Sequence, residues 1–391
     1  MRHLFCLTPV LGPVLALGCG LAQGAHAARA KLIDTFSNGG FAPWYGLAAT
    51  QTALYGVTSL GNSKNDACGT VFRLVRQHGP WSSTTLHAFP CSKGSGEPGA
   101  VTVDNATGDV WGSVVSGSFG AVFRLSQPQH GEKWAYDTIY QFQGGSDGNL
   151  NLTDAPLLLQ GGTAYGIAAA TDNAYGVEFY SLTNNGSGWQ KTSLATIANV
   201  QGSSLVGFDA SGAAYVAANE TGGVGDVYQL APQVGGTWTT TLIAQFNMNR
   251  TLGSIGNLVL DGTGNVFGLK SRGAKNAVFE LMPPSGGGTT WTKSIIADPS
   301  KHGYGLTSLS LGVGGNLLGT IYGDQDFYGG AAIAITKPTK GSGTWNSTIL
   351  WNFGAYGPDT NPLSINVGPY GLYYGTMNNT YDNGAVYQLK P

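Results

Sequence analysis

The sequence has little charge and little histidine for its length. Charged residues make up only 10% of the 391 residues, with 19 Lys and Arg against 21 Asp and Glu. So small and balanced a charge gives no basic patch of the kind that nucleic acid requires. The six histidines show no metal-ligand spacing and no His-Glu-x-x-His segment. The sequence therefore gives no support for a nucleic-acid-binding protein or a zinc protease, and indicates neither a metal nor a cofactor.

Long apolar runs are absent after the first residues. The one such run, Leu4 to Leu21, follows Met1-Arg2-His3 and precedes Ala25-His26-Ala27. A basic start, an apolar stretch and an Ala-x-Ala site are typical of a secretory signal peptide. We therefore expect residues 1–27 to be a signal peptide and residues 28–391 to be a single exported domain.

The mature chain is expected to be secreted or periplasmic, without a transmembrane segment. Removal of Arg2 leaves 18 basic residues against 21 acidic ones, a formal charge of −3. The alternative is a lipoprotein anchored at Cys19, because Ala16-Leu17-Gly18-Cys19 resembles a lipobox.

Cysteine is scarce as well. Cys6 and Cys19 lie in the predicted signal, so Cys68 and Cys91 are the only mature pair among the four cysteines. In an oxidising compartment two cysteines favour a disulfide over a metal site, which needs more ligands. We predict a Cys68–Cys91 bond that closes a loop of about 24 residues.

Glycine, in contrast, is abundant, and it marks a repeated phrase. A small residue, two apolar residues of which the second is often aromatic, a spacer and a final apolar residue recur seven times. The copies lie near residues 71–74, 122–125, 179–182, 227–230, 278–281, 332–335 and 386–389. A second phrase of the type Leu54-Tyr55-Gly56 precedes each copy, and a short apolar strand precedes that. Self-similarity at this period indicates stacked structural units.

A tryptophan opens a further predicted strand after six of the seven copies. These residues, spaced 49 to 55 apart, are Trp81, Trp134, Trp189, Trp238, Trp291 and Trp345. Four antiparallel strands and no helix in each unit predict an all-β fold, a seven-bladed β-propeller of four-stranded blades. We interpret the tryptophans as packing residues at the blade edges, with sugar platforms as the alternative.

The seventh unit ends without an outer strand of its own. The segment from Lys31 to Phe36 has the same apolar-x-x-Phe ending as the other outer strands. We therefore expect the N-terminal strand to complete the last blade and to close the ring, which removes an open sheet edge.

Aspartate and glycine cluster between the first two strands of several units, as in Asp209-Ala210-Ser211-Gly212 and Asp261-Gly262-Thr263-Gly264. These are predicted hairpin turns, since Asp bonds the backbone and Gly accepts a positive φ. Calcium loops are the alternative, but two or three oxygens are too few for a calcium cage.

The two phrases together, Leu54-Tyr55-Gly56-Val57-Thr58 and Gly69-Thr70-Val71-Phe72-Arg73-Leu74, resemble the GloVer-type tandem repeat of exported bacterial proteins. The resemblance covers residues 33 to 390. It implies a repeat protein of the cell exterior, and it implies no established catalytic residues.

Function is expected in the connections of one face, which are unequal in length and chemistry. Acidic and aromatic residues gather there in units 6 and 7, and the candidate ligand-binding set is Asp324, Asp326, Tyr328, Asp359, Tyr381 and Asp382. Carboxylates and amides beside tyrosine suit glycans or another cell-surface polymer. The sequence thus favours a monomeric, non-enzymatic binding or scaffold module. The alternative is a carbohydrate-active hydrolase or lyase that uses a pair such as Asp324 and Asp382 as acid and base.

Overall fold

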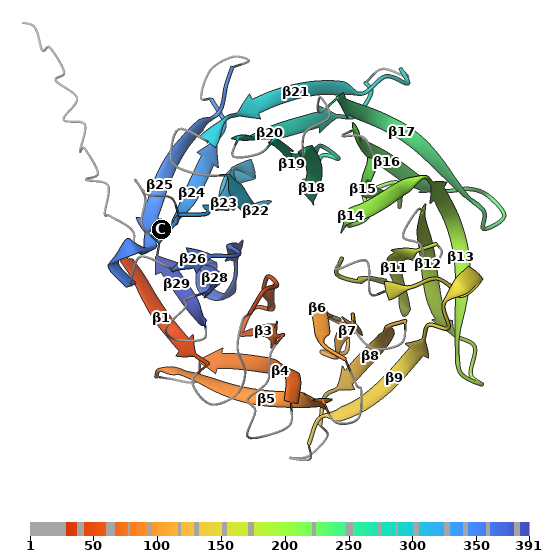
Figure 1. The fold of residues 1–391 in the computed structure, drawn as a ribbon, viewed down its shortest axis with the longest axis horizontal. Helices are drawn as coiled ribbons and strands as arrows, with labels where there is room; N and C mark the ends of the chain where they lie inside the picture. The colour runs from red at the N-terminus through yellow and green to blue at the C-terminus, as the bar shows by residue number, and fades with distance from the viewer. Residues whose placement is uncertain are drawn as a thin grey trace, which may run out of the picture.

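Seven antiparallel β-sheets stand around a common axis in the computed structural model (Figure 1). The structure describes residues 29–36, 43–59, 67–76, 79–91, 96–115, 119–128, 133–150, 155–170, 176–220, 224–247, 253–272, 275–285, 288–299, 305–323, 329–338, 343–356, 360–378 and 384–390. Within these ranges the helical elements are short 3-10 turns such as η2 (Gly145–Asp147). The predicted seven-bladed propeller is confirmed.

Blades 1 to 6 each have four strands that run outward from the axis in chain order. Blade 1 holds β2 (Ala48–Ala49), β3 (Ala53–Thr58), β4 (Ala67–Arg76) and β5 (Trp81–Pro90). Blade 2 holds β6 (Pro98–Val103), β7 (Val110–Val114), β8 (Ala121–Ser126) and β9 (Ala135–Gln141). Blade 3 holds β10 (Leu158–Gln160), β11 (Thr163–Ala169), β12 (Gly176–Asn184) and β13 (Trp189–Ala198).

The later blades repeat this order. Blade 4 holds β14 (Val200–Val206), β15 (Ala214–Glu220), β16 (Val224–Pro232) and β17 (Trp238–Asn247). Blade 5 holds β18 (Gly253–Leu260), β19 (Val266–Arg272), β20 (Lys275–Met282) and β21 (Thr292–Ala297). Blade 6 holds β22 (Leu306–Leu311), β23 (Leu317–Ile321), β24 (Ala331–Thr336) and β25 (Asn346–Asn352).

Blade 7 combines the two ends of the described chain. Its inner part is β26 (Asn361–Pro362) and β27 (Asn366–Val367), both paired with β28 (Tyr373–Asn378), which pairs with β29 (Ala385–Lys390). The outer strand is β1 (Arg29–Thr35), antiparallel to β29 from Arg29 opposite Lys390 to Thr35 opposite Ala385. In Figure 1 the red β1 lies beside the blue β29. The predicted closure by the N-terminal strand is confirmed.

The repeated glycine of the second strand makes room for an aromatic ring of the third. Gly112 lies opposite Phe123, and a Cβ on this glycine would lie 2.5 Å from Phe123 Cζ. The same pairing recurs as Gly56 with Phe72, Gly166 with Tyr180, Gly268 with Phe279, and Gly375 with Tyr387. The rings are buried, because the missing side chain lets each of them lie over the neighbouring strand.

The repeated tryptophans join neighbouring blades. Each indole packs against the second-strand aromatic of the preceding blade, with ring centroids 5.2 to 6.5 Å apart. The pairs are Trp81 with Tyr374, Trp134 with Tyr55, Trp189 with Trp111, Trp238 with Tyr165, Trp291 with Tyr215, and Trp345 with Phe267. Blade 6 has the buried Leu318 at the aromatic position, and no tryptophan is seen in the described part of blade 7. The predicted packing role is confirmed.

Two further sequence predictions hold in the structure. Cys68 and Cys91 form a disulfide, with Cα atoms 4.9 Å apart. The hairpin aspartates organise their turns, since Asp209 Oδ1 accepts the Ser211 and Ala213 amides at 2.8 and 3.0 Å. Asp261 Oδ1 accepts the Thr263 amide at 2.9 Å in the same way.

Candidate functional site

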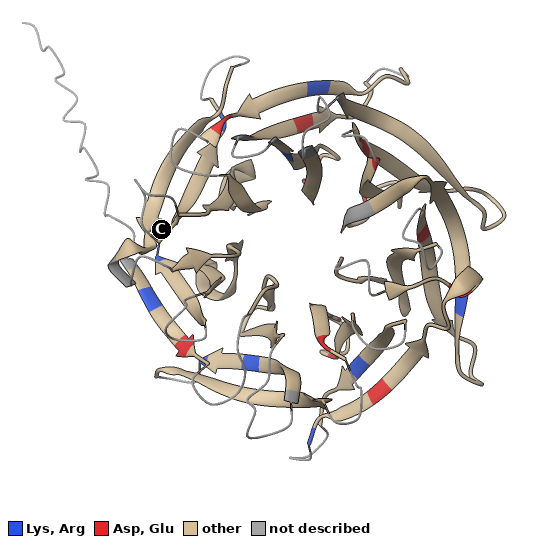
Figure 2. Ribbon diagram, viewed as in Figure 1, with Lys and Arg blue, Asp and Glu red and all other residues tan. Residues whose placement is uncertain are grey.

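The strands that face the axis carry no charge. The sequences of β2, β6, β10, β14, β18, β22, β26 and β27 contain no Asp, Glu, Lys, Arg or His. Figure 2 shows most of the charged positions toward the rim of the ring. A neutral wall around the axis leaves neutral polar groups and apolar groups as the means of recognition.

A cavity of about 640 Å³ lies on the axis, within the size range of ligand sites. All seven blades contribute to its described lining, which is uncharged. Hydroxyl and amide side chains, among them Ser254, Thr307 and Asn366, alternate there with aliphatic ones. Two aromatic residues, Trp44 and Tyr45, lie between β1 and β2 and belong to the lining. Trp44 is 53% exposed, so its indole is available for stacking.

Side-chain hydrogen bonds across the blade junctions hold this wall in place. Asn366 Nδ2 donates to the Leu47 carbonyl at 3.3 Å, which joins blade 7 to blade 1. Asn276 Nδ2 donates to the Leu306 carbonyl at 2.9 Å, which joins blade 5 to blade 6. Between blades 4 and 5, Asn219 exchanges two hydrogen bonds with the backbone of Ile255. The cavity is therefore preorganised, because its inner strands are fixed to one another.

A hydroxyl network completes the wall on the side of blades 6 and 7. Thr307 Oγ1 lies 2.6 Å from Thr320 Oγ1 and donates to the Pro362 carbonyl at 3.1 Å. Thr376 Oγ1 donates to the Tyr45 carbonyl at 3.2 Å, so the segment that carries the exposed Trp44 is tied to blade 7. This hydrogen bond fixes the backbone next to Trp44 at the cavity.

The six residues predicted as a ligand site lie outside the described residues. They are Asp324, Asp326, Tyr328, Asp359, Tyr381 and Asp382. Whether they converge remains a prediction. Sequence reasoning did not single out Trp44, although its place outside the tryptophan repeat, just before the first inner strand, was the available signal.

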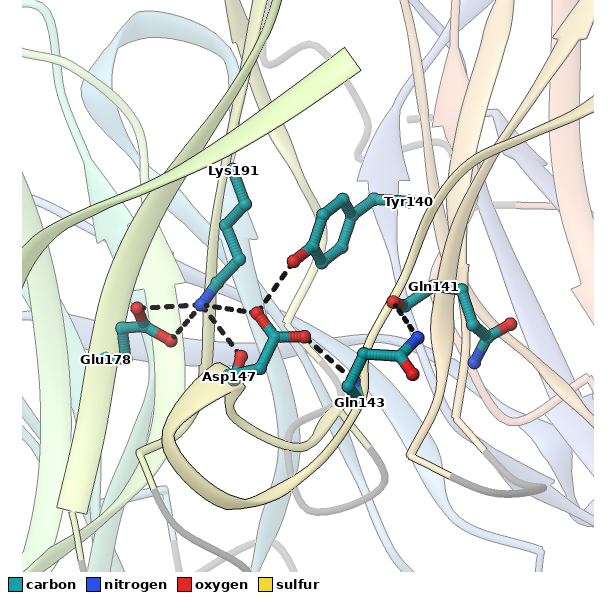
Figure 3. Close-up of polar contacts among 6 residues, drawn as sticks. All are labelled: Tyr140, Gln141, Gln143, Asp147, Glu178 and Lys191. Atoms are coloured by element: carbon teal, nitrogen blue, oxygen red, sulfur yellow. Dashed lines mark hydrogen bonds and ion pairs between the residues drawn. The ribbon is translucent and has the colours of Figure 1, made fainter. Parts of the chain in front are cut away.

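The densest charged cluster of the described chain lies between blades 2 and 3, away from the cavity lining (Figure 3). Lys191 Nζ lies 2.8 Å from Glu178 Oε2 and 3.5 Å from Asp147 Oδ1, and it donates to the Asp147 carbonyl at 2.7 Å. Tyr140 Oη donates to Asp147 Oδ1 at 2.7 Å. Burial and this contact with Asp147 raise the pKa of Tyr140. Since β9, η2, β12 and β13 supply these groups, the cluster joins two blades.

A second acidic site lies in blade 4. Asp226 is 1% exposed, its Oδ2 accepts the Tyr228 hydroxyl at 3.2 Å, and its Oδ1 has no hydrogen-bond partner among the described residues. Partial burial and the charge of Asp226 raise the pKa of Glu220. Neither carboxyl group lines the cavity.

No protein-family model matches this sequence, and no curated protein matches it. The solved structures that share its fold include YCF48 from Cyanidioschyzon merolae, with 14% identity and a TM-score of 0.55 over 93% of this chain and 98% of that one. A candidate 6-phosphogluconolactonase from Bacteroides uniformis has 16% identity and a TM-score of 0.53 over 78% of this chain and 84% of that one. A protein from Lactobacillus plantarum has 15% identity and a TM-score of 0.54, covering 80% and 84%. At such identities the similarity shows the propeller fold alone.

Two further observations concern the described residues only. Among them, no three His, Cys, Asp or Glu side chains gather as a metal ion would require. None of their helices has the length and hydrophobicity needed to cross a membrane.

Proposed function

We propose that this protein is an exported binding module that takes a neutral, hydroxyl-rich ligand, namely a glycan, in the axial cavity. The observation that carries the proposal is that the described lining, drawn from seven blades, is uncharged and holds the exposed Trp44 beside hydroxyl and amide groups. Sugars combine apolar ring faces with hydroxyl groups, so an indole and fixed polar side chains match both parts. The hydrogen bonds across the blade junctions support binding, because a preorganised site loses little entropy when it is occupied.

We propose that the protein binds this ligand after export. The predicted signal peptide, the Cys68–Cys91 disulfide and the resemblance to GloVer-type repeats all favour a secreted or periplasmic protein. A monomer suffices for the proposed function, since one ring supplies the whole cavity wall.

The competing function is a carbohydrate-active hydrolase or lyase that uses Asp324 and Asp382. Glycoside hydrolysis needs two carboxyl groups at a defined separation. The described cavity lining has none, so this function depends on the acidic loops of blades 6 and 7. It predicts release of reducing ends from any glycan that binds.

The test is a glycan array with the mature protein, together with an assay of reducing-sugar release from the same glycans. Binding without release supports the module, and Trp44→Ala should weaken it about tenfold or more, the usual effect of removing a stacking anchor. Tyr370→Asn is the matched control, because Tyr370 is 59% exposed in a hairpin turn of blade 7 and Asn tolerates its positive φ. Binding that Trp44→Ala leaves unchanged, or binding confined to charged glycans, would contradict the proposal.

A further inference from the structure

One position of the repeat differs in chemistry between the blade junctions. It is the third-strand residue opposite the second-strand aromatic, occupied by Arg73 opposite Tyr55, Arg124 opposite Trp111 and Gln229 opposite Tyr215. Since the next blade packs its tryptophan against the same aromatic ring, this residue lies at the entrance to the aromatic pair.

Arginine occupies this position at the first two junctions. The Arg73 guanidinium lies 5.8 Å from the ring centroid of Tyr55, and that of Arg124 lies 5.7 Å from the ring of Trp111. Arg124 also pairs with Asp137 of its own outer strand at 3.0 Å. At the junction of blades 7 and 1, the Trp81 indole donates to Gln388 Oε1 instead. At these junctions the aromatic pair is in contact with side chains of the protein itself.

The junction of blades 4 and 5 has glutamine at this position. Gln229 Nε2 donates to Tyr215 Oη of its own blade at 3.3 Å, and the side chain opposite Gln229 on the outer strand is the short, exposed Thr241. A groove of about 600 Å³ remains, lined by Gln229, Thr241, Tyr215 and, from blade 5, Trp291.

The two carboxylates at the groove are occupied by hydrogen bonds within their own blades. Asp209 and Asp261 belong to the lining, but both hold their own hairpin turns. Asp209 Oδ2 accepts the Tyr215 hydroxyl at 2.6 Å, and Asp261 Oδ2 accepts Asn265 Nδ2 at 3.1 Å. Partial burial acts to raise the pKa of Asp209, yet hydrogen bonds from Ser211, Tyr215 and Ala213 lower it overall. The Trp291 indole, the Gln229 amide and the Thr241 hydroxyl are left for a ligand.

We propose that this groove is a second ligand site, for a single pyranose ring of a neutral sugar. The aromatic wall matches the apolar face of the ring, and Gln229 and Thr241 match its hydroxyl groups. The groove lies among hairpins that join first to second and third to fourth strands. The axial cavity includes Ser271 and Asn276, at the connection of second to third strand, so an up-and-down blade places the two sites on opposite faces. The proposal is independent of the one made for the cavity.

A variant that should close the groove can be copied from another junction of the same protein. Gln229→Arg with Thr241→Asp copies the Arg124–Asp137 pair, and the new arginine would lie over Tyr215 as Arg73 lies over Tyr55. Thr241→Asp alone is the matched control for charge. Gln229→Leu, of similar size and without the amide, is a second variant in case the double variant folds poorly.

The probes are the methyl glycosides of glucose, galactose, mannose and N-acetylglucosamine, measured by saturation-transfer NMR. We expect at least one glycoside to bind the Trp44→Ala protein. Its affinity should fall about tenfold or more in the double variant and in Gln229→Leu. A signal that Trp44→Ala removes, and that the groove variants leave intact, would place all binding in the cavity and overturn the second site. Absence of transfer from every glycoside to the wild-type and Trp44→Ala proteins would overturn it as well.

Discussion

Trp81 Nε1 donates to Gln388 Oε1 at 3.1 Å, although the two residues are 307 positions apart in the sequence. Trp81 opens the outer strand of blade 1, and Gln388 lies in β29 of blade 7, opposite Lys31 of β1. The bond thus crosses the junction at which the ring closes. On one side of it the last blade takes its outer strand from the N-terminus.

Deletion of residues 28–38 should destabilise the whole ring. The deletion removes β1, which is the pairing partner of β29. It also removes Phe36, whose ring packs against Phe72 at a centroid distance of 5.0 Å. An unpaired edge and exposed apolar surface then remain at the closing junction. Thermal unfolding followed by circular dichroism checks this, and a melting temperature equal to that of the full mature protein would refute it.

Lys191→Met should lower the free energy of unfolding by about 3–5 kcal/mol, the usual cost of leaving a buried charge without its partner. The variant leaves the Glu178 and Asp147 carboxylates without the ammonium group that lies between them. Chemical denaturation measures the loss. The double variant Lys191→Met, Glu178→Gln should recover part of it, because one of the two charges is then gone. Equal stability of the single variant and the wild type would contradict this role of Lys191.

Loss of the Cys68–Cys91 bond should destabilise the protein by about 3 kcal/mol, the chain-entropy value for a loop of this length. Cys68 belongs to β4 and Cys91 directly follows β5, so the bond joins the third and outer strands of blade 1 at one end. The double variant Cys68→Ser, Cys91→Ser is the molecule to compare. Intact-mass analysis after alkylation without reductant should show no free thiol at these positions in the wild type.

Stability should fall as the pH drops through about 6.5, in part through His87. Burial lowers the pKa of His87 from 6.5, and its ring stacks on Tyr136 at 4.2 Å. Below pH 6.5 the His87 side chain of the unfolded protein therefore binds a proton, whereas that of the folded protein binds one only at a lower pH. Protonation thus favours the unfolded state in this range. His87→Phe keeps an aromatic ring and should flatten this part of the pH profile. An identical profile for the variant and the wild type would exclude the contribution of His87.

The sequence predicted the architecture because every blade must solve the same packing problem. The repeat predicted the blades and the packing role of the tryptophans, as seen for Trp189 against Trp111. The role of the repeated glycine, as in Gly112 opposite Phe123, followed only from the structure. The outer strand of blade 7 followed from the one unit that lacked its own.

The sites were harder to predict because they depend on departures from the repeat. Trp44 has no counterpart in the tryptophan series, and its place at the axis follows from seven inner strands meeting there, not from any local pattern. Gln229 and Arg124 occupy the same repeat position, and only three-dimensional packing shows that Gln229 lines a groove whereas Arg124 pairs with Asp137. The role of Lys191 depends on its contact with Asp147 of another blade, which only the structure shows.

The pairing of β1 with β29 also sets an order of events during synthesis. The ribosome makes Arg29–Thr35 long before Ala385–Lys390, so at about 10 residues per second β1 waits on the order of half a minute for its partner. Until then no closed ring exists, because the first strand lacks its β partner. Ring closure is therefore a late event in the synthesis of the described chain, because it must wait until β29 has left the ribosome.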